Sequence, residues 1–471
     1  MKQNTILWHD YETFGADPKR DRPAQFAAIR TDEDLNEIGT PINIHCSPAD
    51  DFLPAPMACL VTGITPQEAK AKGVPEVEFI KRVNEAFSVP GTCGAGYNTI
   101  RFDDEVTRNT LYRNLMDPYE REWRNGNSRW DIIDMARTCY ALRPEGINWP
   151  EREDGAPSFK LEHLTAANGL SHESAHDALS DVRATIAFAK LIKEKQPRLY
   201  DYLYTHRFKN KVRSLVDVVG MTPLLHVSSK ISAFQGCCTW VLPLLEHPTN
   251  KNAIVVVDLN CDPTPLLDMS SEQIIEALYS RGTDTEYRPP LKLIHLNKCP
   301  VLAPAKMLTP DNAERLGIDR EGCLAHLAWW KQNSQLKHTI AEVYEQPFSG
   351  GVDDPDFGLY GGFFSDHDKH CMQVIHQANP SDLPALQPNF ENPQLHEMFF
   401  RFKARNYPEL LSEQEQVRWR VFRESRLASP NPYAIDIETF SIELENLAHE
   451  HENDAAKMAI LRSLYQYAQS L

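Results

Sequence analysis

The first third of the chain alternates short apolar runs with amphipathic stretches. Residues 5–14 form an apolar run that ends on polar side chains, and the runs at 93–97 and 130–134 also predict strands. Between them, helical spacing recurs at Val106, Thr110 and Arg113, and again over residues 177–190. Strands that alternate with helices are typical of an α/β layer architecture. We predict such a domain over residues 1–194, ending before Pro197, which disfavours helix in the preceding residue.

The pattern changes in the middle and again near the C-terminus. Runs typical of strands at 239–242, 253–257 and 291–295 are separated by turn residues, and helices are expected after 310. The stretch 348–355 is rich in Gly, acid and Pro and predicts a linker, whereas 386–471 has helical periodicity. We therefore predict a β-rich second domain with helices over 195–349 and a helical third domain over 350–471.

Composition narrows the cellular setting. The chain has 471 residues, and a hydrophobic content of 42% is enough for real cores. Neither a signal-peptide pattern nor an apolar run of about 20 residues is present. The ten cysteines are scattered without a Cys-x-x-Cys pair, which argues against structural zinc and disulfides. We expect a cytoplasmic protein that is not associated with a membrane.

The net charge of −17 is unevenly distributed along the chain. Residues 1–190 and 351–471 each carry −9, whereas residues 191–350 carry +1. Five basic side chains stand beside three tyrosines in this middle part: Arg198, Arg207, Lys209, Lys211 and Arg213, with Tyr200, Tyr202 and Tyr204. This mixture suits a single-stranded nucleic acid and its stackable bases, and equally a solvated amphipathic helix.

Asp10 and Glu12 end the first apolar run. Two positions apart on a strand, their carboxylates point to the same face. Converging acids repel unless a cation lies between them, and Mg²⁺ prefers oxygen ligands of this kind. Asp-x-Glu by itself is weak evidence, because it recurs at 284–286 and 319–321 in this acidic chain.

A close copy of this motif occurs at residues 436–440. Asp-Ile-Glu-Thr-Phe follows Asn431-Pro432, which is a helix-start signal, and its apolar residues recur at helical offsets. Residues two apart on a helix face different directions. We predict that this copy is a surface helix.

Three more residues complete a candidate site. Asp103 stands where a strand gives way to a helix, and its alternative role is a helix cap; the neighbouring Asp104 competes with it for the site. His176 precedes Asp181 by five residues at the start of a helix with an apolar stripe. A histidine that titrates near neutrality can accept a proton from water, although a lone histidine there is more often a surface residue. Together, four carboxylates and one histidine suit phosphodiester cleavage assisted by two divalent cations.

The ordered set resembles the DnaQ-like (DEDDh) 3′→5′ exonucleases. Their signatures, Asp-x-Glu-Thr, Asn…Phe-Asp and His-x-x-x-x-Asp, stand here at 10–13, 98–103 and 176–181, with accessory segments at 62–65 and 160–164. The segments 102–108, 127–131, 140–150 and 296–302 further resemble the bacterial exonuclease I family, so the resemblance spans nearly the whole chain.

The resemblance implies an RNase H-like exonuclease core, an SH3-like β-rich domain and a helical C-terminal domain. It implies a monomer that degrades single-stranded DNA from the 3′ end, releasing 5′-mononucleotides, in DNA repair and recombination. By position, two Mg²⁺ ions, replaceable by Mn²⁺, would be held by Asp10, Glu12, Asp103 and Asp181, with His176 as general base. The implied substrate contacts are Glu12, Arg108, Tyr119, Trp123, Arg137 and Lys160.

Two departures from the family pattern bear on binding. Lys160 stands where the family has Arg, so the charge is kept but the bidentate fork is lost. The family also binds the acidic-hydrophobic C-terminal tail of single-stranded-DNA-binding protein, for which Arg143, Tyr202 and Lys331 are the implied residues. Pro304 and Thr309 fall where longer polar or basic side chains are expected.

Two alternatives to this function remain open. One is an RNase or a proofreading subunit with the same fold, although such proteins generally lack two large appended domains. The other is a nucleic-acid-binding protein that kept the fold without catalysis, which the complete set of five residues argues against.

Overall fold

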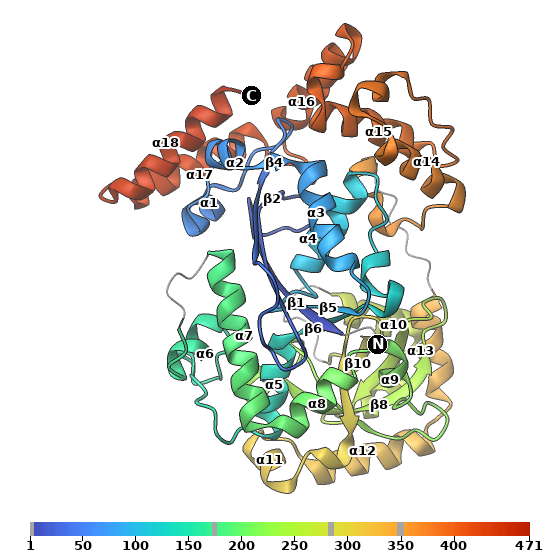
Figure 1. The fold of residues 1–471 in the computed structure, drawn as a ribbon. Helices are drawn as coiled ribbons and strands as arrows, with labels where there is room; N and C mark the ends of the chain where they lie inside the picture. Colours follow the sequence, from blue (N-terminus) through green and yellow to red (C-terminus); the bar gives the residue numbers. More distant parts are fainter. Residues whose placement is uncertain (1–3, 172–176, 281–286, 346–352) are drawn as a thin grey trace. The chain divides into compact units, whose positions relative to one another are not determined.

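The computed structural model describes residues 4–171, 177–280, 287–345 and 353–471, which form two compact units (Figure 1). The first unit comprises residues 1–128, 172–183 and 350–471, and the second comprises 129–171 and 184–349. Among the described residues, no helix is long and apolar enough to cross a membrane. Part of the linker predicted at 348–355 lies outside the described residues.

The first unit is built on a mixed sheet. Its strands are β1 (Thr5–Thr13), β2 (Pro23–Thr31), β3 (Ile42–Ser47), β4 (Val74–Pro75) and β5 (Thr92–Gly96), in the order β4-β3-β2-β1-β5. Strand β1 pairs antiparallel with β2 and parallel with β5. Its helices are α1 (Pro56–Thr62), α2 (Pro66–Lys72), α3 (Glu76–Ser88), α4 (Asp103–Arg113), α14 (Asp366–Gln377), α15 (Gln394–Asn406), α16 (Glu413–Ala428), α17 (Ile437–Glu450) and α18 (Ala455–Gln469). The strands predicted at 5–14 and 93–97 are confirmed.

Strand β1 is buried on both faces. Leu7 and Tyr11 pack into one cluster with Phe79 of α3 and Val106 of α4. Because side chains alternate along a strand, this packing turns Asp10 and Glu12 to the opposite face. The apolar alternation of β1 thus fixes the direction of both carboxylates.

The C-terminal helices complete the core of the first unit. Phe14, which directly follows β1, shares a hydrophobic cluster with Phe52 and with Phe440, Leu464 and Tyr467 of α17 and α18. The copied motif at 436–440 is the start of α17, where the Asp436 side chain accepts hydrogen bonds from the backbone N–H groups of Glu438 and Thr439 (3.1 and 3.0 Å). The predicted helix is therefore confirmed, and its aspartate is a cap.

The second unit contains a five-stranded antiparallel sheet in the order β10-β9-β8-β7-β11. Its strands are β7 (Leu224–Val227), β8 (Cys238–Glu246), β9 (Ala253–Asp258), β10 (Leu291–His295) and β11 (Val301–Pro304), and its helices are α5 (Ile132–Leu142), α6 (Leu161–Ala167), α8 (Pro197–Thr205), α9 (Lys209–Arg213), α10 (Ser271–Tyr279), α11 (Pro310–Arg315), α12 (Arg320–Gln332) and α13 (Leu336–Glu345). Strand β6 (Ser128–Asp131) and helix α7 (Ala178–Lys195) cross the unit boundary along the chain. The β-rich middle region and the helices after 310 are confirmed.

One predicted strand is too long. Residues 130–134 were expected as a strand, but β6 ends at Asp131 and α5 begins at Ile132. The reason is local, because the Asp131 side chain accepts a hydrogen bond from the Ile133 N–H (3.2 Å) and caps the helix. A short apolar run alone does not distinguish a strand from the first turn of a buried helix.

A buried ionic cluster joins the N-terminal and C-terminal parts of the first unit. Asp51 is fully buried and accepts hydrogen bonds from Nε and Nη2 of Arg405 (3.0 and 2.8 Å). The same guanidinium binds Asp356 with two bonds (3.0 and 2.5 Å). Burial alone would raise the pKa of Asp51, but Arg405 and then Arg22 and Arg426 hold it at about 2.

We predict that Asp51→Asn destabilises the protein by about 3–5 kcal/mol, because it leaves buried arginines without their counter-charge. Since the pKa of Asp51 is about 2 in the folded protein and 3.8 ordinarily, its stabilisation is present above pH 4 and is lost as the pH falls toward 2. Urea unfolding at pH 7 and at pH 3 measures both effects.

The neighbouring Asp50 provides the matched control. Its carboxylate contacts Arg423 and accepts a hydrogen bond from Trp419 Nε1 (3.0 Å), but its side chain is 40% exposed. Asp50→Asn should therefore cost no more than about 1 kcal/mol. Equal losses for the two variants would contradict a dominant role for the buried cluster.

Candidate active site

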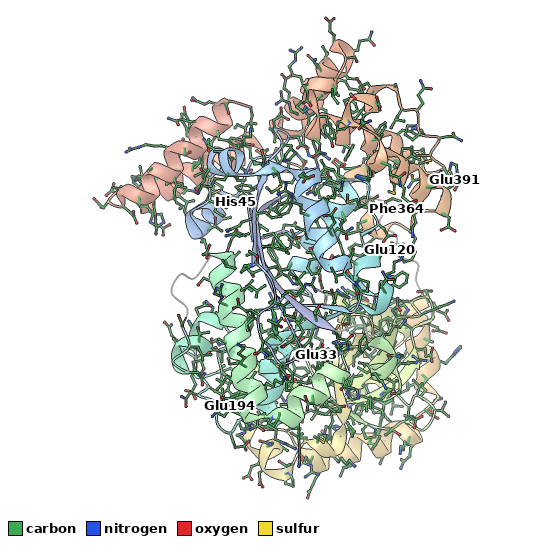
Figure 2. The ribbon with its side chains drawn as sticks, viewed as in Figure 1. Glu33, His45, Glu120, Glu194, Phe364 and Glu391 are labelled. Carbon is green, nitrogen blue, oxygen red and sulfur yellow. The ribbon has the colours of Figure 1, made fainter. Side chains whose placement is uncertain are left out.

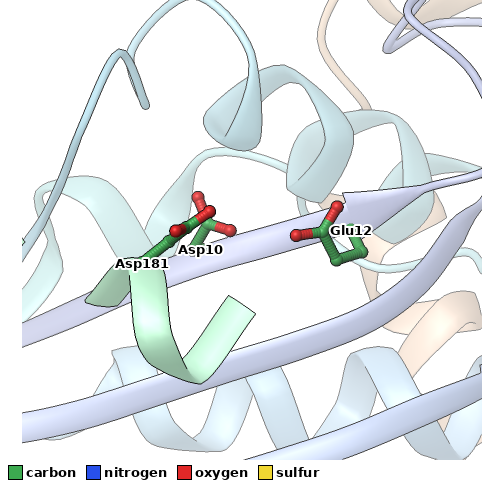
Figure 3. Close-up of side chains that lie close together, drawn as sticks. All are labelled: Asp10, Glu12 and Asp181. Carbon is green, nitrogen blue, oxygen red and sulfur yellow. The ribbon is translucent and has the colours of Figure 1, made fainter. Parts of the chain in front are cut away.

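Asp10, Glu12 and Asp181 bring their carboxylates together over one face of β1 (Figure 3). One carboxylate oxygen from each lies within 4.8 Å of the others. Asp10 and Glu12 are two positions apart on the strand, opposite Ala27 and Gln25 of β2. The strand geometry predicted from the sequence places both acids on the same face.

Asp181 reaches this face from the first turn of α7. The helix buries Ala178 and Val182 completely or almost so, which fixes its rotation about its own axis. The Asp177 side chain accepts a hydrogen bond from the Ser180 N–H (3.1 Å) and thereby caps the helix just before Asp181. A cap and an apolar stripe therefore position the third carboxylate.

Asp103 contacts the backbone of β1 at Tyr11. It is the first residue of α4, is 3% exposed, and accepts a hydrogen bond from the Tyr11 N–H through Oδ1 (3.0 Å). The neighbouring Asp104 instead binds the Arg121 guanidinium (2.8 Å). Of the two adjacent acids, Asp103 is therefore the one that faces β1. It contacts Tyr11, which lies between Asp10 and Glu12 in the sequence.

Neighbouring acids raise the pKa of Asp10 and of Glu12. Burial raises the pKa of Asp10 well above its ordinary value, and Asp103, Asp181 and Asp177 raise it further. Burial, then Asp10, Asp181 and Asp177, raise the pKa of Glu12 to about 9. A partly buried group of carboxylates at this spacing fits hard divalent cations, which prefer oxygen ligands and relieve the repulsion.

Asp177 is a contributor that sequence reasoning missed. It acts on the pKa of both Asp10 and Glu12, as well as capping α7. Its position directly after His176 was the available signal, but an acid next to a histidine is common in this chain. His176 itself lies outside the described residues.

The substrate contacts expected in the first unit differ in exposure. Trp123 is 64% exposed, whereas Arg108 is buried and its guanidinium binds Glu122 (2.7 and 2.8 Å) and Glu105 (2.7 Å). The same guanidinium lies 5.5 Å from the ring centroid of Tyr119. The Trp123 ring is accessible to a stacking base. The Arg108 guanidinium is instead engaged by Glu105 and Glu122.

The remaining expected contacts lie in the second unit. Arg137 is buried and binds Asp134 (2.6 Å), while the Lys160 side chain is 68% exposed. Of the residues expected to bind a protein tail, Tyr202 donates to the Leu302 carbonyl (2.9 Å) and Lys331 is exposed at the end of α12. The Arg143 guanidinium donates to the Leu142 carbonyl.

The basic stretch at 198–213 forms α8 and α9. Its tyrosines are partly used in packing, because Tyr200 is 2% exposed and the Arg207 guanidinium lies 3.5 Å from the Tyr204 ring centroid. The stretch therefore has the helical structure that was one of the two interpretations of its sequence.

Three family models together match most of the chain. They are described as Exonuclease (residues 7–189), Exonuclease I SH3-like domain (207–346) and Exonuclease I C-terminal domain (353–471). The first covers all four carboxylates of the site. The fold therefore combines an exonuclease core, an SH3-like domain and a helical C-terminal domain, as predicted.

Full-length relatives agree with these matches. The chain is 50% identical to exodeoxyribonuclease I of Escherichia coli over 474 residues, which cover 100% of this chain and 98% of the relative. The zinc-bound crystal structure of an E. coli exonuclease I–single-stranded DNA complex is similar with a TM-score of 0.95 and 49% identity, covering 100% and 99% of the two chains. A structure described as SSB/exonuclease I with the inhibitor CFAM has a TM-score of 0.93, 49% identity and full coverage of both chains.

We predict that Glu12→Gln stabilises the metal-free protein at pH 8. Because the pKa of Glu12 rises from 4.5 to about 9 on folding, the folded protein keeps a proton that the unfolded chain releases, so stability falls as the pH rises across this interval. The glutamine variant removes this loss. We expect a gain of about 1 kcal/mol or more at pH 8 and almost none at pH 4.5, measured by urea unfolding in EDTA.

The same repulsion predicts a response to divalent cations. Mg²⁺ or Mn²⁺ should raise the melting temperature of the wild-type protein at pH 8, and Asp181→Asn should weaken this rise. Glu443→Gln, which changes an acid of α17, is the control. A rise of the same size in Asp181→Asn and wild type would contradict cation binding at this site.

Proposed function

The chain belongs to the exonuclease I family of exodeoxyribonucleases, and on this premise we propose that it degrades single-stranded DNA from the 3′ end, releasing 5′-mononucleotides. The observation that carries the proposal is the convergence of Asp10, Glu12 and Asp181 within 4.8 Å, with Asp103 hydrogen-bonded beside them. Relatives whose structures contain single-stranded DNA support the choice of substrate.

We assign two divalent cations, Mg²⁺ with Mn²⁺ as a substitute, to Asp10, Glu12, Asp103 and Asp181. When bound, such ions lower the pKa of an attacking water and stabilise the leaving oxygen of a phosphodiester. Asp103 also accepts a hydrogen bond from the backbone N–H of Tyr11, the residue between the two strand acids. His176 is the proposed proton acceptor, because imidazole titrates near neutrality.

We propose that the DNA strand is bound by base stacking and by contacts to its phosphates. Trp123 and Tyr119 would stack on bases, and Lys160 and Arg137 would meet phosphates. Arg108 is held by Glu105 and Glu122, and its proximity to the Tyr119 ring suits a residue that orients the stacking surface. Glu12 would contact the terminal nucleotide while holding a cation.

We further propose a partner and a setting. The SSB/exonuclease I structure supports single-stranded-DNA-binding protein as a partner. We propose that the C-terminal tail of that protein binds at Arg143, Tyr202 and Lys331. Tyr202 is held by the Leu302 carbonyl and its ring stacks on His206 (4.0 Å between centroids), so its face is fixed for such a contact. Action as a cytoplasmic monomer in DNA repair and recombination completes the proposal.

We predict that Asp181→Ala lowers the rate of cleavage by at least about 100-fold while strand binding persists, because it removes a cation ligand and leaves the stacking residues intact. The measurement uses 5′-labelled single-stranded DNA with Mg²⁺ or EDTA, and fluorescence anisotropy in EDTA for binding. Circular dichroism checks that the variant is folded.

The same assay separates the alternatives. A wild-type protein that binds DNA but never shortens it with Mg²⁺ or Mn²⁺ would be the non-catalytic binding protein. Equal shortening of RNA would indicate the RNase alternative, and shortening from the 5′ end, followed with 3′-labelled DNA, would contradict the polarity.

We also predict that Trp123→Ala weakens single-stranded DNA binding by about 1–3 kcal/mol, the usual contribution of one stacked base. Tyr465→Ala removes an aromatic side chain of similar exposure (58%) from α18 and should leave binding unchanged. Anisotropy titrations at one fixed salt concentration compare the two. Equal affinities for wild type and Trp123→Ala would exclude Trp123 from the strand path.

A further inference from the structure

A cavity of about 430 Å³ opens in the first unit, lined by residues other than the four carboxylates assigned to cations. Its walls are the end of α3, the residues just after α4, the segment 120–127 and helix α14. Glu120, at one wall, is labelled in Figure 2. This volume is near the lower end of the range for ligand pockets, so it suits one small molecule.

Three permanent cations and two carboxylates line the cavity, and each carboxylate is paired with one of the cations. Asp117 accepts hydrogen bonds from the N–H groups of Tyr119 and Glu120 (2.9 and 3.0 Å) through Oδ1, and binds Lys369 of α14 through Oδ2 (2.8 Å). Glu120 binds Arg124 (2.5 Å). Arg121, the third cation, is held by Asp104.

The rest of the lining includes amide and apolar side chains. Asn84, Asn125 and Gln373 offer both donors and acceptors, which is the pattern that reads the edge of a nucleobase. The thioethers of Met116 and Met372 suit the face of an aromatic ring. Lysine and arginine side chains bind phosphate by charge-assisted hydrogen bonds.

We propose that this cavity binds one nucleoside 5′-monophosphate, with the phosphate at Lys369 and Arg124 and the base between the methionines and the amides. The identity of the ligand rests on the proposed function, because that reaction releases nucleoside 5′-monophosphates. The cavity is a product site separate from the carboxylates that hold the cations.

A ligand in the cavity would affect binding of the DNA strand through one segment, residues 120–127. Residues 120–127 form a wall of the cavity and also carry the exposed Trp123. Asn127 ties this segment to the sheet and to α3, since it accepts from Thr92 N (3.1 Å) and donates to the Phe87 carbonyl (2.9 Å). A ligand held between this segment and α14 restricts the segment, so accumulated product alters the hold on the next strand.

The test is calorimetric titration of the full-length protein with dAMP in EDTA, where no divalent cation occupies the carboxylate site. We expect one site per chain. Gln373→Trp should abolish binding by filling the cavity, and Lys369→Gln should weaken it about tenfold by removing a phosphate partner. Gln377→Trp, one turn along α14 and not part of the lining, is the matched control and should bind normally.

Several results would overturn the proposal. They are no binding by the wild type, binding by Gln373→Trp equal to the wild type, loss of binding in Asp10→Asn, or an affinity for inorganic phosphate equal to that for dAMP. The last would indicate a simple anion site. Exonuclease activity of the same preparations is measured separately with Mg²⁺, so an inactive protein that binds dAMP refutes the proposed function and leaves the cavity assignment standing.

Discussion

The central constraint on this molecule is the repulsion among carboxylates held together on a buried strand. Asp10 and Glu12 cannot separate, because the alternation of β1 fixes them on one face, and Asp181 and Asp103 approach from two helices. The raised pKa values of Asp10 and Glu12 record the cost of this arrangement. Strong packing of β1 between β2 and β5, with Ile6, Leu7 and Trp8 all buried, keeps the acids together in spite of it.

The same unit contains buried aspartates with the opposite behaviour. Asp51 and Asp356 are more deeply buried than Asp10, yet arginines such as Arg405 lower the pKa of both. The difference lies in the charged neighbours. Arginines lower the pKa of Asp51 and Asp356, whereas the charged groups that act on the pKa of Asp10 and Glu12 are all acids. Paired acids fasten the C-terminal helices to the core, whereas the mutually repelling acids are suited to receive metal ions.

Helices from the end of the chain support the strand at its beginning. Phe14, two residues after Glu12, packs with Phe440 and Leu464, and Arg405 of α15 reaches Asp51. These contacts join residues about 350 to 450 positions apart. The C-terminal region therefore contributes to the rigidity of the catalytic strand, and its helix α14 forms one wall of the cavity.

The sequence by itself determined the strand acids, the order of the α/β elements and the rejection of the copied motif at Asp436, because each depends on local periodicity or capping. It extended the strand at Asp131 too far, since one side-chain cap decides between strand and helix there. It could not reveal that Arg108 is engaged by Glu105 and Glu122, that Asp177 acts on the site, or that α3 and α14 enclose a cavity. Those features were decided only by the tertiary structure, because they arise from groups far apart in the chain whose distances and burial no local pattern encodes.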